Sequence, residues 1–353
     1  MNVLIISLNF NPGHFSHLVA NYKLFEDCGF TPYLYIHKSF NYMDEKNEFR
    51  KINRSSELSG LKEIYAAVFW FPGLKNTYEI IKLRILFRSK IIYIFHEPFD
   101  SIKNYYKAGF GFKDIVRICL INLVNISVIL LSHRLVLPSS TSFSLYERKY
   151  TILNNNYSLI PLLFDDENFK KEEFHKKFIS YIGTIANDHA FDRFVAFVDA
   201  AIKNDWFPDL NFLIATRSNI PAREKNILKP HMQSGKVVIA EGHPMTTSEI
   251  NHYFSSSFVV WNAYNRSNQS GILPKAYMFG AAVVVSSNNV SKFMENHKTG
   301  IIVYDNNDVW EIKKAVEEIL SKKEFFSENC RKKFLGTFYY KSKISDFNAL
   351  LNE

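Results

Sequence analysis

Short β-rich runs alternate with segments of helical periodicity twice along this chain, and this alternation restricts its possible folds more than any other feature. In the first half, strands are predicted at 3–8, 32–36, 66–71, 91–95 and 134–137, and helices at 15–27 and 113–131. Strands separated by helices pair in parallel through crossover connections. The first half therefore predicts a doubly wound α/β domain.

The alternation stops around Asn154-Asn155-Asn156 and in the charged stretch 168–177, where we place a linker. It then resumes, with strands at 178–182, 211–215, 236–240, 258–261 and 281–286 and helices at 192–203, 274–279 and 309–320. We expect two Rossmann-like doubly wound domains, 1–165 and 166–335, that face a cleft. A C-terminal helix within 336–353 is expected to pack back on the first domain.

Length and cysteine usage agree with an α/β protein of two domains. The chain has 353 residues, and its three cysteines are far apart, at Cys28, Cys119 and Cys330. This scatter argues against a disulfide framework and a cysteine-based zinc site, and favours a reducing cytoplasm. Residues 1–8 predict a buried strand rather than a signal peptide. The longest apolar run, 118–131, is expected to be too short to span a bilayer.

The net charge of +8 favours an anionic partner, although solubility alone would also account for it. The stretch 82–117 holds eight basic residues and three acids, and aromatic residues are interleaved among them, including Phe87, Phe99, Tyr105, Tyr106, Phe110 and Phe112. Such a segment suits contact with the anionic inner face of the cytoplasmic membrane, and the alternative is a solvated face above core aromatics. Nucleic acid is not an expected partner, because no known binding module is present.

The most informative local feature is the segment 261–280, in which a strand end, a polar loop with a glycine and a helix start follow one another. Backbone N–H groups and the helix dipole favour anions at such a start, where Pro274 fits the first turn. The alternative is an ordinary capped helix. The candidate ligand-binding residues in this segment are Asn262, Arg266, Ser267, Asn268, Gln269, Ser270, Gly271, Ile272 and Lys275. Arg266 and Lys275 would neutralise a diphosphate.

Two further candidates follow strands of the first domain. His96 and Glu97 come directly after the buried strand 91–95, so Glu97 is a candidate general base and His96 a candidate hydrogen-bond partner of a sugar hydroxyl. A polar turn closed by Pro98 is the alternative. Gly13 follows the first strand and would allow close approach of a ligand. The G-x-G-x-x-G pattern is missing there, which disfavours a nicotinamide or flavin cofactor.

The second domain adds candidates after three of its strands. Gly183 and Thr184 follow the strand 178–182, and Arg217 follows the strand 211–215. His243 would stack on a nucleobase or be an ordinary loop histidine. The sequence contains no metal-binding histidine spacing, no G-x-S-x-G and no Walker loop, so neither a metal nor a cofactor is expected.

The order of these features resembles that of the bacterial GT-B glycosyltransferases, in the group that includes glycosyltransferase family 4. The resemblance runs from about residue 1 to residue 307. It rests on the following segments, in this order: Pro12-Gly13, Phe95-His96-Glu97, Arg134-Leu135-Val136-Leu137-Pro138-Ser139-Ser140, Ile160-Pro161, Tyr181-Ile182-Gly183, Ser270-Gly271, Lys275 to Ser286, and Lys298-Thr299-Gly300-Ile301-Ile302-Val303.

The resemblance implies a metal-independent hexosyltransferase with a nucleotide-diphosphate sugar as donor and a lipid-linked glycan as acceptor, in O-antigen, capsule or exopolysaccharide assembly. It implies a cytoplasmic protein peripheral to the inner face of the membrane. Family 4 enzymes retain the anomeric configuration, whereas Glu97 would also suit the base of an inverting enzyme. The family has two glutamates with seven residues between them, and here Ser267 and Lys275 stand at those positions.

Two other functions fit the same fold class. The missing glutamate pair suits a non-catalytic protein that binds nucleotide sugars or acts as a scaffold in a polysaccharide complex. The third hypothesis is a sugar-nucleotide epimerase, which would release nucleotide-sugar isomers rather than free nucleotide.

Overall fold

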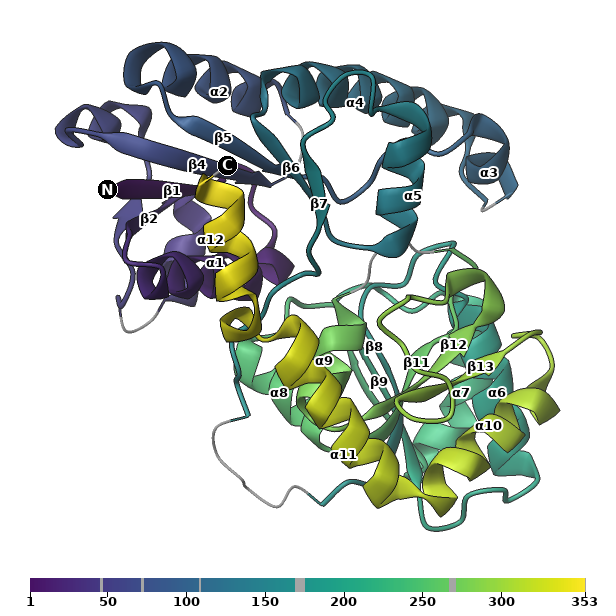
Figure 1. Cartoon of the computed structure of the whole chain (residues 1–353). Coiled ribbons are helices and arrows are strands. Elements are labelled where there is room, and N and C mark those ends of the chain that lie inside the picture. Colours follow the sequence, from purple (N-terminus) through teal and green to yellow (C-terminus); the bar gives the residue numbers. More distant parts are fainter. Residues whose placement is uncertain (45–46, 71–72, 108, 169–174, 267–270, 353) are drawn as a thin grey trace. The chain divides into compact units, whose positions relative to one another are not determined.

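The computed structural model describes residues 1–353 except 45–46, 71–72, 108, 169–174, 267–270 and 353. The chain divides into two compact units (Figure 1). Unit 1 consists of Met1–Asp165 and Thr337–Glu353, and unit 2 of Asp166–Gly336.

Unit 1 is built on a seven-stranded parallel sheet with the order β3-β2-β1-β4-β5-β6-β7. The strands are β1 (Asn2–Ser7), β2 (Thr31–Ile36), β3 (Lys51–Ile52), β4 (Ile64–Trp70), β5 (Lys90–Ile94), β6 (Arg134–Leu137) and β7 (Tyr157–Leu159). The central strands are almost continuously apolar because both faces of the sheet are covered. The carboxyl ends of β1, β4 and β5 are neighbours along one edge.

Helices cover both faces of this sheet (Figure 1). On one face lie α2 (Leu74–Phe87) and α4 (Phe112–Leu131), and on the other lie α1 (Phe15–Asp27) and α12 (Ile344–Asn352). The remaining helices are α3 (Ile102–Lys107), α5 (Ser140–Lys149), the 3-10 segments Pro12–His14, Lys38–Met43, Ser55–Gly60 and Tyr340–Lys343, and the π-helical turn Phe334–Phe338.

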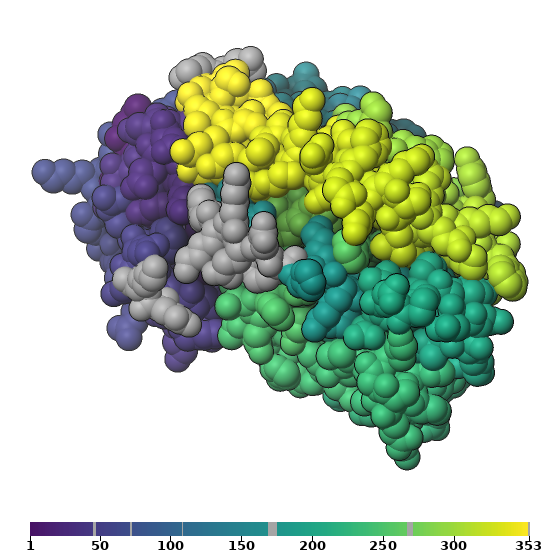
Figure 2. All heavy atoms as spheres, turned by 90° about the horizontal axis from the view of Figure 1, so that it is seen from below, coloured from purple at the N-terminus to yellow at the C-terminus, as the bar shows by residue number. Residues whose placement is uncertain are grey.

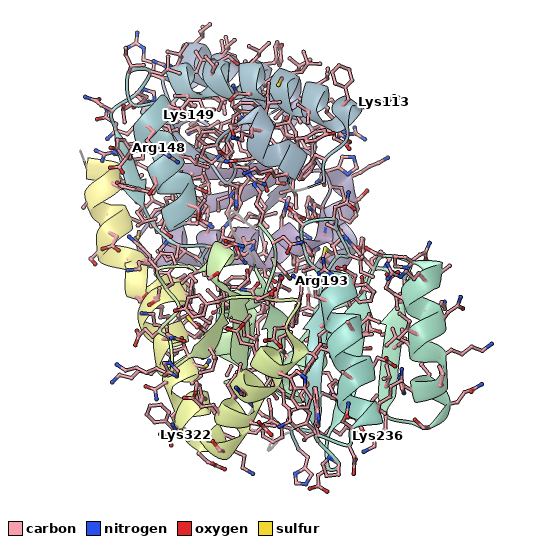
Figure 3. All side chains as sticks on the ribbon, turned by 90° about the vertical axis from the view of Figure 1, so that its right-hand side faces the viewer. Lys113, Arg148, Lys149, Arg193, Lys236 and Lys322 are labelled. Atoms are coloured by element: carbon pink, nitrogen blue, oxygen red, sulfur yellow. The ribbon has the colours of Figure 1, made fainter. Side chains whose placement is uncertain are left out.

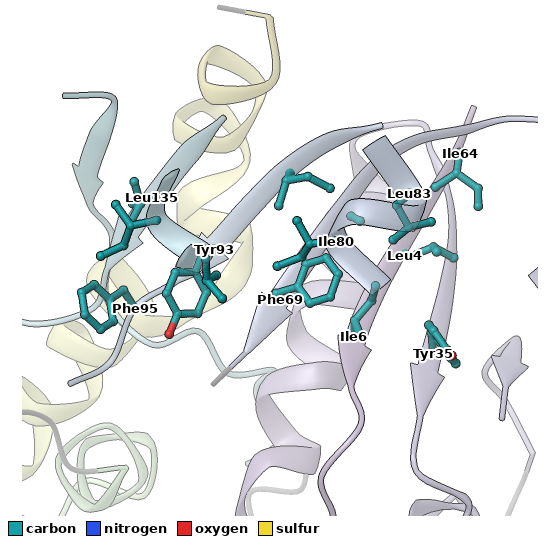
Figure 4. Close-up of a cluster of buried hydrophobic side chains, with 14 of the residues drawn as sticks. Leu4, Ile6, Tyr35, Ile64, Phe69, Ile80, Leu83, Tyr93, Phe95 and Leu135 are labelled. Carbon is teal, nitrogen blue, oxygen red and sulfur yellow. The ribbon is translucent and has the colours of Figure 1, made fainter. Parts of the chain in front are cut away.

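A cluster of buried apolar side chains fills the layer between the sheet and helices α2 and α4 (Figure 4). Leu4, Ile6 and Phe69 come from the strands, and Ile80 and Leu83 come from α2. Each is fully buried. Burial of a side chain of this size contributes about 1.5–3 kcal/mol, so this layer is a principal source of the stability of unit 1.

The last residues of the chain pack on unit 1. The Phe164 N–H donates to the carbonyl of Phe338 (2.9 Å), and the Tyr340 N–H donates to the carbonyl of Phe164 (3.1 Å). The Phe347 ring packs edge-on against Phe25 of α1. Figure 2 shows the yellow spheres of the C-terminal segment beside the purple spheres of the N-terminal residues.

Unit 2 is a six-stranded parallel sheet with the order β10-β9-β8-β11-β12-β13. The strands are β8 (Phe178–Ile182), β9 (Asn211–Thr216), β10 (Val237–Glu241), β11 (Ser257–Asn262), β12 (Ala282–Ser286) and β13 (Gly300–Val303). The helices are α6 (Phe191–Lys203), α7 (Ala222–Gln233), α8 (Thr247–Ser255), α9 (Ile272–Met278), α10 (Val309–Ser321), α11 (Lys323–Lys333) and the 3-10 turn Ser287–Asn289. The expectation of two Rossmann-like parallel α/β domains is confirmed.

Two expectations about helices need correction. The apolar run 118–131 was expected to be too short to span a bilayer, but it belongs to α4, whose 20 residues are long and apolar enough for that by length and composition. The apolar run is shorter than the helix because charged residues precede Ile118, whereas the helix itself begins at Phe112.

The helix expected at 274–279 begins at Ile272, so Pro274 is its third residue. Its missing N–H still falls in the first turn, where no intrahelical bond is lost.

Candidate functional site

The loops that follow β8, β9 and β11 converge at one edge of the sheet of unit 2. Gly183, directly after β8, has φ of +135°, a conformation that side chains rarely adopt. A Cβ atom at this position would lie 3.3 Å from Ile272 Cδ1 and 4.0 Å from the Tyr264 hydroxyl. The loop after β8 therefore packs closely against the start of α9, and its backbone conformation favours glycine at position 183.

Thr184 links the loop after β8 to the loop after β9. Arg217 donates from Nε to Thr184 Oγ1 (3.2 Å), and the Ile185 N–H is bonded to Ser218 Oγ (3.1 Å). The Thr184 carbonyl accepts from the Tyr181 hydroxyl (2.8 Å). Arg217 is exposed, so its guanidinium group lies at the surface of this cluster. A fixed arginine at the carboxyl edge of a parallel sheet suits the binding of an anion.

The loop after β11 is tied to the loop after β8. The Asn265 N–H donates to the Asp188 carbonyl (2.8 Å), and the Arg266 N–H lies 3.4 Å from the same oxygen. The His189 ring stacks on Tyr264, with ring centroids 4.3 Å apart and planes inclined by 9°. These contacts hold the polar loop ahead of α9 in a defined place. Ser267, Asn268, Gln269 and Ser270 lie outside the described residues.

The first turn of α9 begins beside these loops. Its N–H groups belong to Ile272 and Leu273, since Pro274 has none. Asn262, at the end of β11, is 4% exposed, and within the described residues no group donates a hydrogen bond to its Oδ1 atom. A buried acceptor without a donor is uncommon in native proteins. Asn262 is therefore a candidate ligand contact.

The surroundings of two more predicted donor contacts, Lys275 and His243, are as follows. The Lys275 ammonium lies 2.7 Å from Glu167 Oε2 and 3.0 Å from Asn251 Oδ1, and Asn251 Nδ2 donates to the same Glu167 oxygen (2.7 Å). Lys275 is thus engaged in a buried ion pair with Glu167. His243 is exposed after β10, the edge strand, which is separated from β8 by β9.

In unit 1, His96 lies in a cluster of aromatic rings at the carboxyl edge of the sheet. Its ring centroid is 5.2 Å from that of Trp70, which stacks in turn on His17 (5.5 Å). Burial lowers the pKa of the His96 imidazole well below its ordinary value, and the neighbouring His17 and His14 act in the same direction. His96 is therefore neutral at neutral pH and can hydrogen-bond a hydroxyl group without carrying charge.

The remaining candidates of unit 1 differ in how strongly the structure restricts them. Glu97 is exposed next to His96, so its carboxylate is accessible to an acceptor. A Cβ atom at Gly13 would make only an ordinary contact, 3.6 Å from Asn11 Oδ1, so the local backbone does not require glycine there. The indole N–H of Trp70 is buried and has no acceptor within the described part of the chain.

The structure thus brings together Gly183, Thr184, Arg217, Arg266, Gly271, Ile272 and Asn262 in unit 2, and His96 and Glu97 in unit 1. Sequence reasoning missed Tyr264, Asp188 and Trp70. Each follows or ends a strand, and that position was the signal which would have found them. Among the described residues, no group of three or more His, Cys, Asp or Glu side chains could hold a metal ion.

No protein-family model and no curated protein sequence matches this chain. Several solved structures are similar to it. A sucrose-phosphate synthase from Thermosynechococcus elongatus is similar with a TM-score of 0.71 and 12% identity over 99% of this chain and 98% of that one. A glycosyltransferase from Rickettsia africae is similar with a TM-score of 0.72 and 11% identity, over 99% of this chain and 97% of that one. The Anabaena protein HepE, solved in complex with UDP, is similar with a TM-score of 0.70 and 10% identity, over the whole of both chains.

These likenesses extend over nearly the whole chain, and at such low identity they define the fold. Together with the two parallel sheets, they show that the chain has the GT-B fold, with two Rossmann-like domains. The part of the sheet edge that carries the converging loops in unit 2 is where open α/β sheets bind their ligands.

Proposed function

We propose that this protein is a glycosyltransferase that uses a nucleotide-diphosphate sugar as donor. The observation that carries the proposal is the convergence of Gly183, Thr184, Arg217 and Ile272 at the carboxyl edge of the sheet of unit 2. It is supported by full-length similarity to a structure named a glycosyltransferase, from Rickettsia africae, and to HepE, which has been solved with UDP and with UDP-glucose.

In the proposed complex, unit 2 binds the donor. The diphosphate lies near the N–H groups of Gly271 and Ile272, and Arg217 and Arg266 balance its charge. Glycine at 183 lets the loop after β8 approach Ile272 at the start of α9. Because arginine side chains stabilise the charge of the leaving diphosphate, the reaction proceeds without a metal ion. Lys275 does not contact the donor in this proposal; its ion pair with Glu167 holds α9 in place.

Unit 1 provides the acceptor side of the proposed reaction. Neutral His96 hydrogen-bonds a hydroxyl of the sugar, and Glu97 lies beside it. The acceptor oxygen forms a bond to the anomeric carbon, the bond from that carbon to the diphosphate breaks, and the hydroxyl proton passes to the leaving diphosphate, with retention of configuration. The acceptor is a lipid-linked glycan of surface polysaccharide assembly (O-antigen, capsule or exopolysaccharide), at the cytoplasmic side of the membrane.

A nucleotide panel followed by a transfer assay tests this function. Thermal shift with UDP, GDP, dTDP and CDP identifies the base, and the matching nucleotide sugars are then assayed for transfer to lipid-linked acceptors. One nucleotide is expected to raise the melting temperature, and its sugar is expected to be turned over. Absence of binding by all four nucleotides would contradict the donor site, whatever the acceptor.

A non-catalytic nucleotide-sugar-binding protein is the second candidate, and one observation favours it. Lys275, which stands where the resembled family has a glutamate, is engaged with Glu167. Nucleotide binding without transfer or hydrolysis of any donor sugar would support this candidate over the enzyme.

A further inference from the structure

Two helices of unit 1 present stripes of exposed apolar residues. On α4 the stripe consists of Phe112, Val116, Leu120, Leu123 and Leu130, which are 80%, 42%, 60%, 63% and 55% exposed. On α2 it consists of Leu74, Tyr78, Ile81 and Ile85, which are also exposed. The spacing within each stripe is three, four or seven residues, so each stripe lies along one side of its helix. We call these nine residues the apolar face.

The interior side of α4 shows that this orientation is fixed. Asn125 Oδ1 accepts from the buried Tyr93 hydroxyl (2.8 Å), and Asn122 Oδ1 accepts from the Tyr150 hydroxyl (2.6 Å). The helix thus turns these two amide side chains toward the protein and its leucines outward, whereas a surface helix of a soluble protein usually buries its apolar side chains. An exposed apolar patch of this kind marks a surface that another apolar phase covers.

The two stripes point away from the same face of the sheet. Helices α2 and α4 lie side by side on that face (Figure 1), and Arg84 of α2 donates from Nη1 to the Leu131 carbonyl at the end of α4 (2.7 Å). In each helix the buried residues lie opposite the stripe, with Ile80 and Leu83 on α2 and Val128 and Ile129 on α4. The apolar face is therefore one surface made by two helices.

The charge around the apolar face is positive. Between residues 74 and 131, the described part of the chain exposes six basic residues and two acids, Glu97 and Asp114. Lys113 follows Phe112 and Arg117 follows Val116 by one position, so both flank the stripe of α4, and Figure 3 labels Lys113 at the end of that helix. The exposed basic residues are Lys75, Arg88, Lys103, Lys107, Lys113 and Arg117. Positive flanks around an apolar strip complement an anionic lipid surface.

In this fold α4 is held on the sheet by one of its sides. The helix satisfies the length and composition of a membrane span, with 22% of its most apolar window buried in the protein. To span a bilayer it would have to leave the sheet, which would expose Val128 and Ile129 and break the bond between Asn125 and Tyr93. A helix held by one side and apolar on the other fits a position in the plane of the membrane surface.

We propose that the apolar face is a membrane-binding surface, on which α2 and α4 lie parallel to an anionic bilayer and insert their leucine, isoleucine and aromatic side chains at the boundary between head groups and acyl chains. The basic flanks contact the phosphate groups. This differs from a patch of basic and aromatic residues over 82–117, because Tyr105 is buried there between Phe99 and Phe110 and the inserting residues are mainly aliphatic.

The experiment is sedimentation of the full chain with vesicles. The chain is expected to bind vesicles that contain phosphatidylglycerol and to bind phosphatidylcholine vesicles more weakly. The variant Leu120→Glu/Leu123→Glu, at two exposed positions, is expected to bind at least about tenfold less. Ile152→Glu is the matched control, because Ile152 is 92% exposed in unit 1 outside α2 and α4, and it is expected to bind like the parent.

Three outcomes would overturn the proposal. The first is a parent protein that stays in the supernatant with anionic vesicles, and the second is equal binding by the parent and the Leu120/Leu123 variant. The third is a dimer in sedimentation velocity that the same variant dissociates, which would assign the face to a second copy of the chain. Nucleotide-induced thermal shifts of these variants separate this result from the proposed transferase function, since vesicle binding requires no donor.

Discussion

Gly183 and Ile272 are 89 positions apart in the sequence, yet no more than a small gap separates the backbone of the first from the side chain of the second. A Cβ atom at position 183 would lie 3.3 Å from Ile272 Cδ1, and the φ of +135° at that glycine is itself restrictive. This contact joins the end of β8 to the start of α9. It defines the centre of the proposed donor site.

Replacement of Gly183 by alanine is therefore expected to weaken nucleotide binding. The backbone conformation alone costs on the order of 1–3 kcal/mol with a side chain present, and the new methyl group displaces Ile272. The measurement is nucleotide affinity by calorimetry together with the melting temperature. Gly235→Ala is the control, because Gly235 has φ of +75° with open space around it at the end of α7. It is expected to lower stability and to leave affinity unchanged; equal affinity losses would remove Gly183 from the site.

Arg217→Ala is expected to lower nucleotide affinity by about 10- to 100-fold, since a hydrogen bond to a charged group contributes about 1.5–3 kcal/mol. The side chain is exposed and oriented by Thr184, so its loss should change the melting temperature of the ligand-free protein little. Arg223→Ala, on the exposed side of α7, is the matched charge control. If both variants lose affinity equally, the effect belongs to overall charge and not to the position of Arg217.

Lys275→Met is expected to destabilise unit 2 by about 3 kcal/mol, because it leaves the Glu167 carboxylate without its charge partner in a largely buried place. The Lys275 and Glu167 side chains are 9% and 19% exposed, so solvent screens this pair only partly. The double variant Lys275→Met/Glu167→Leu is expected to recover most of the loss in urea unfolding. A strong loss of nucleotide affinity in that stable double variant would return Lys275 to the donor contacts.

The lowered pKa of His96 predicts a stability change in acid. Below an unfolded-state pKa of about 6.5 the unfolded chain takes up a proton at this histidine, whereas the native protein does not, so the free energy of unfolding falls as the pH drops. One such group contributes a slope of up to about 1.4 kcal/mol per pH unit. His96→Gln is expected to show a shallower fall than the parent between about pH 7 and pH 5. Parallel curves for the two proteins would show that position 96 is not the source.

Much of the fold was predictable because parallel α/β units leave a strong local pattern. The strands 134–137 and 178–182 and the helix 15–27 have the same bounds in the structure as in the sequence prediction. Helix α2 was missed for a physical reason. Its exposed side carries Leu74, Tyr78 and Ile85, so the contrast between a polar and an apolar side, on which such predictions depend, is weak.

The site was predictable only in part, since a residue's position after a strand says where it lies but not what it contacts. That rule predicted Gly183 and Arg217, and in the structure Arg217 contacts Thr184 and Gly183 lies against Ile272. Lys275 satisfied the same rule, but its partner Glu167 is 108 positions away, beyond any local pattern.

Two parallel α/β domains follow from the amino-acid sequence, because hydrophobic periodicity and the alternation of strands and helices are local properties of the chain. Which charges face one another, and which apolar residues remain exposed, depends on how the elements pack. Asn125 turns inward because Tyr93, 32 positions earlier, provides its hydrogen bond, and Leu120 and Leu123 turn outward as a consequence. Such choices depend on contacts between distant residues, and those exist only when the chain is folded.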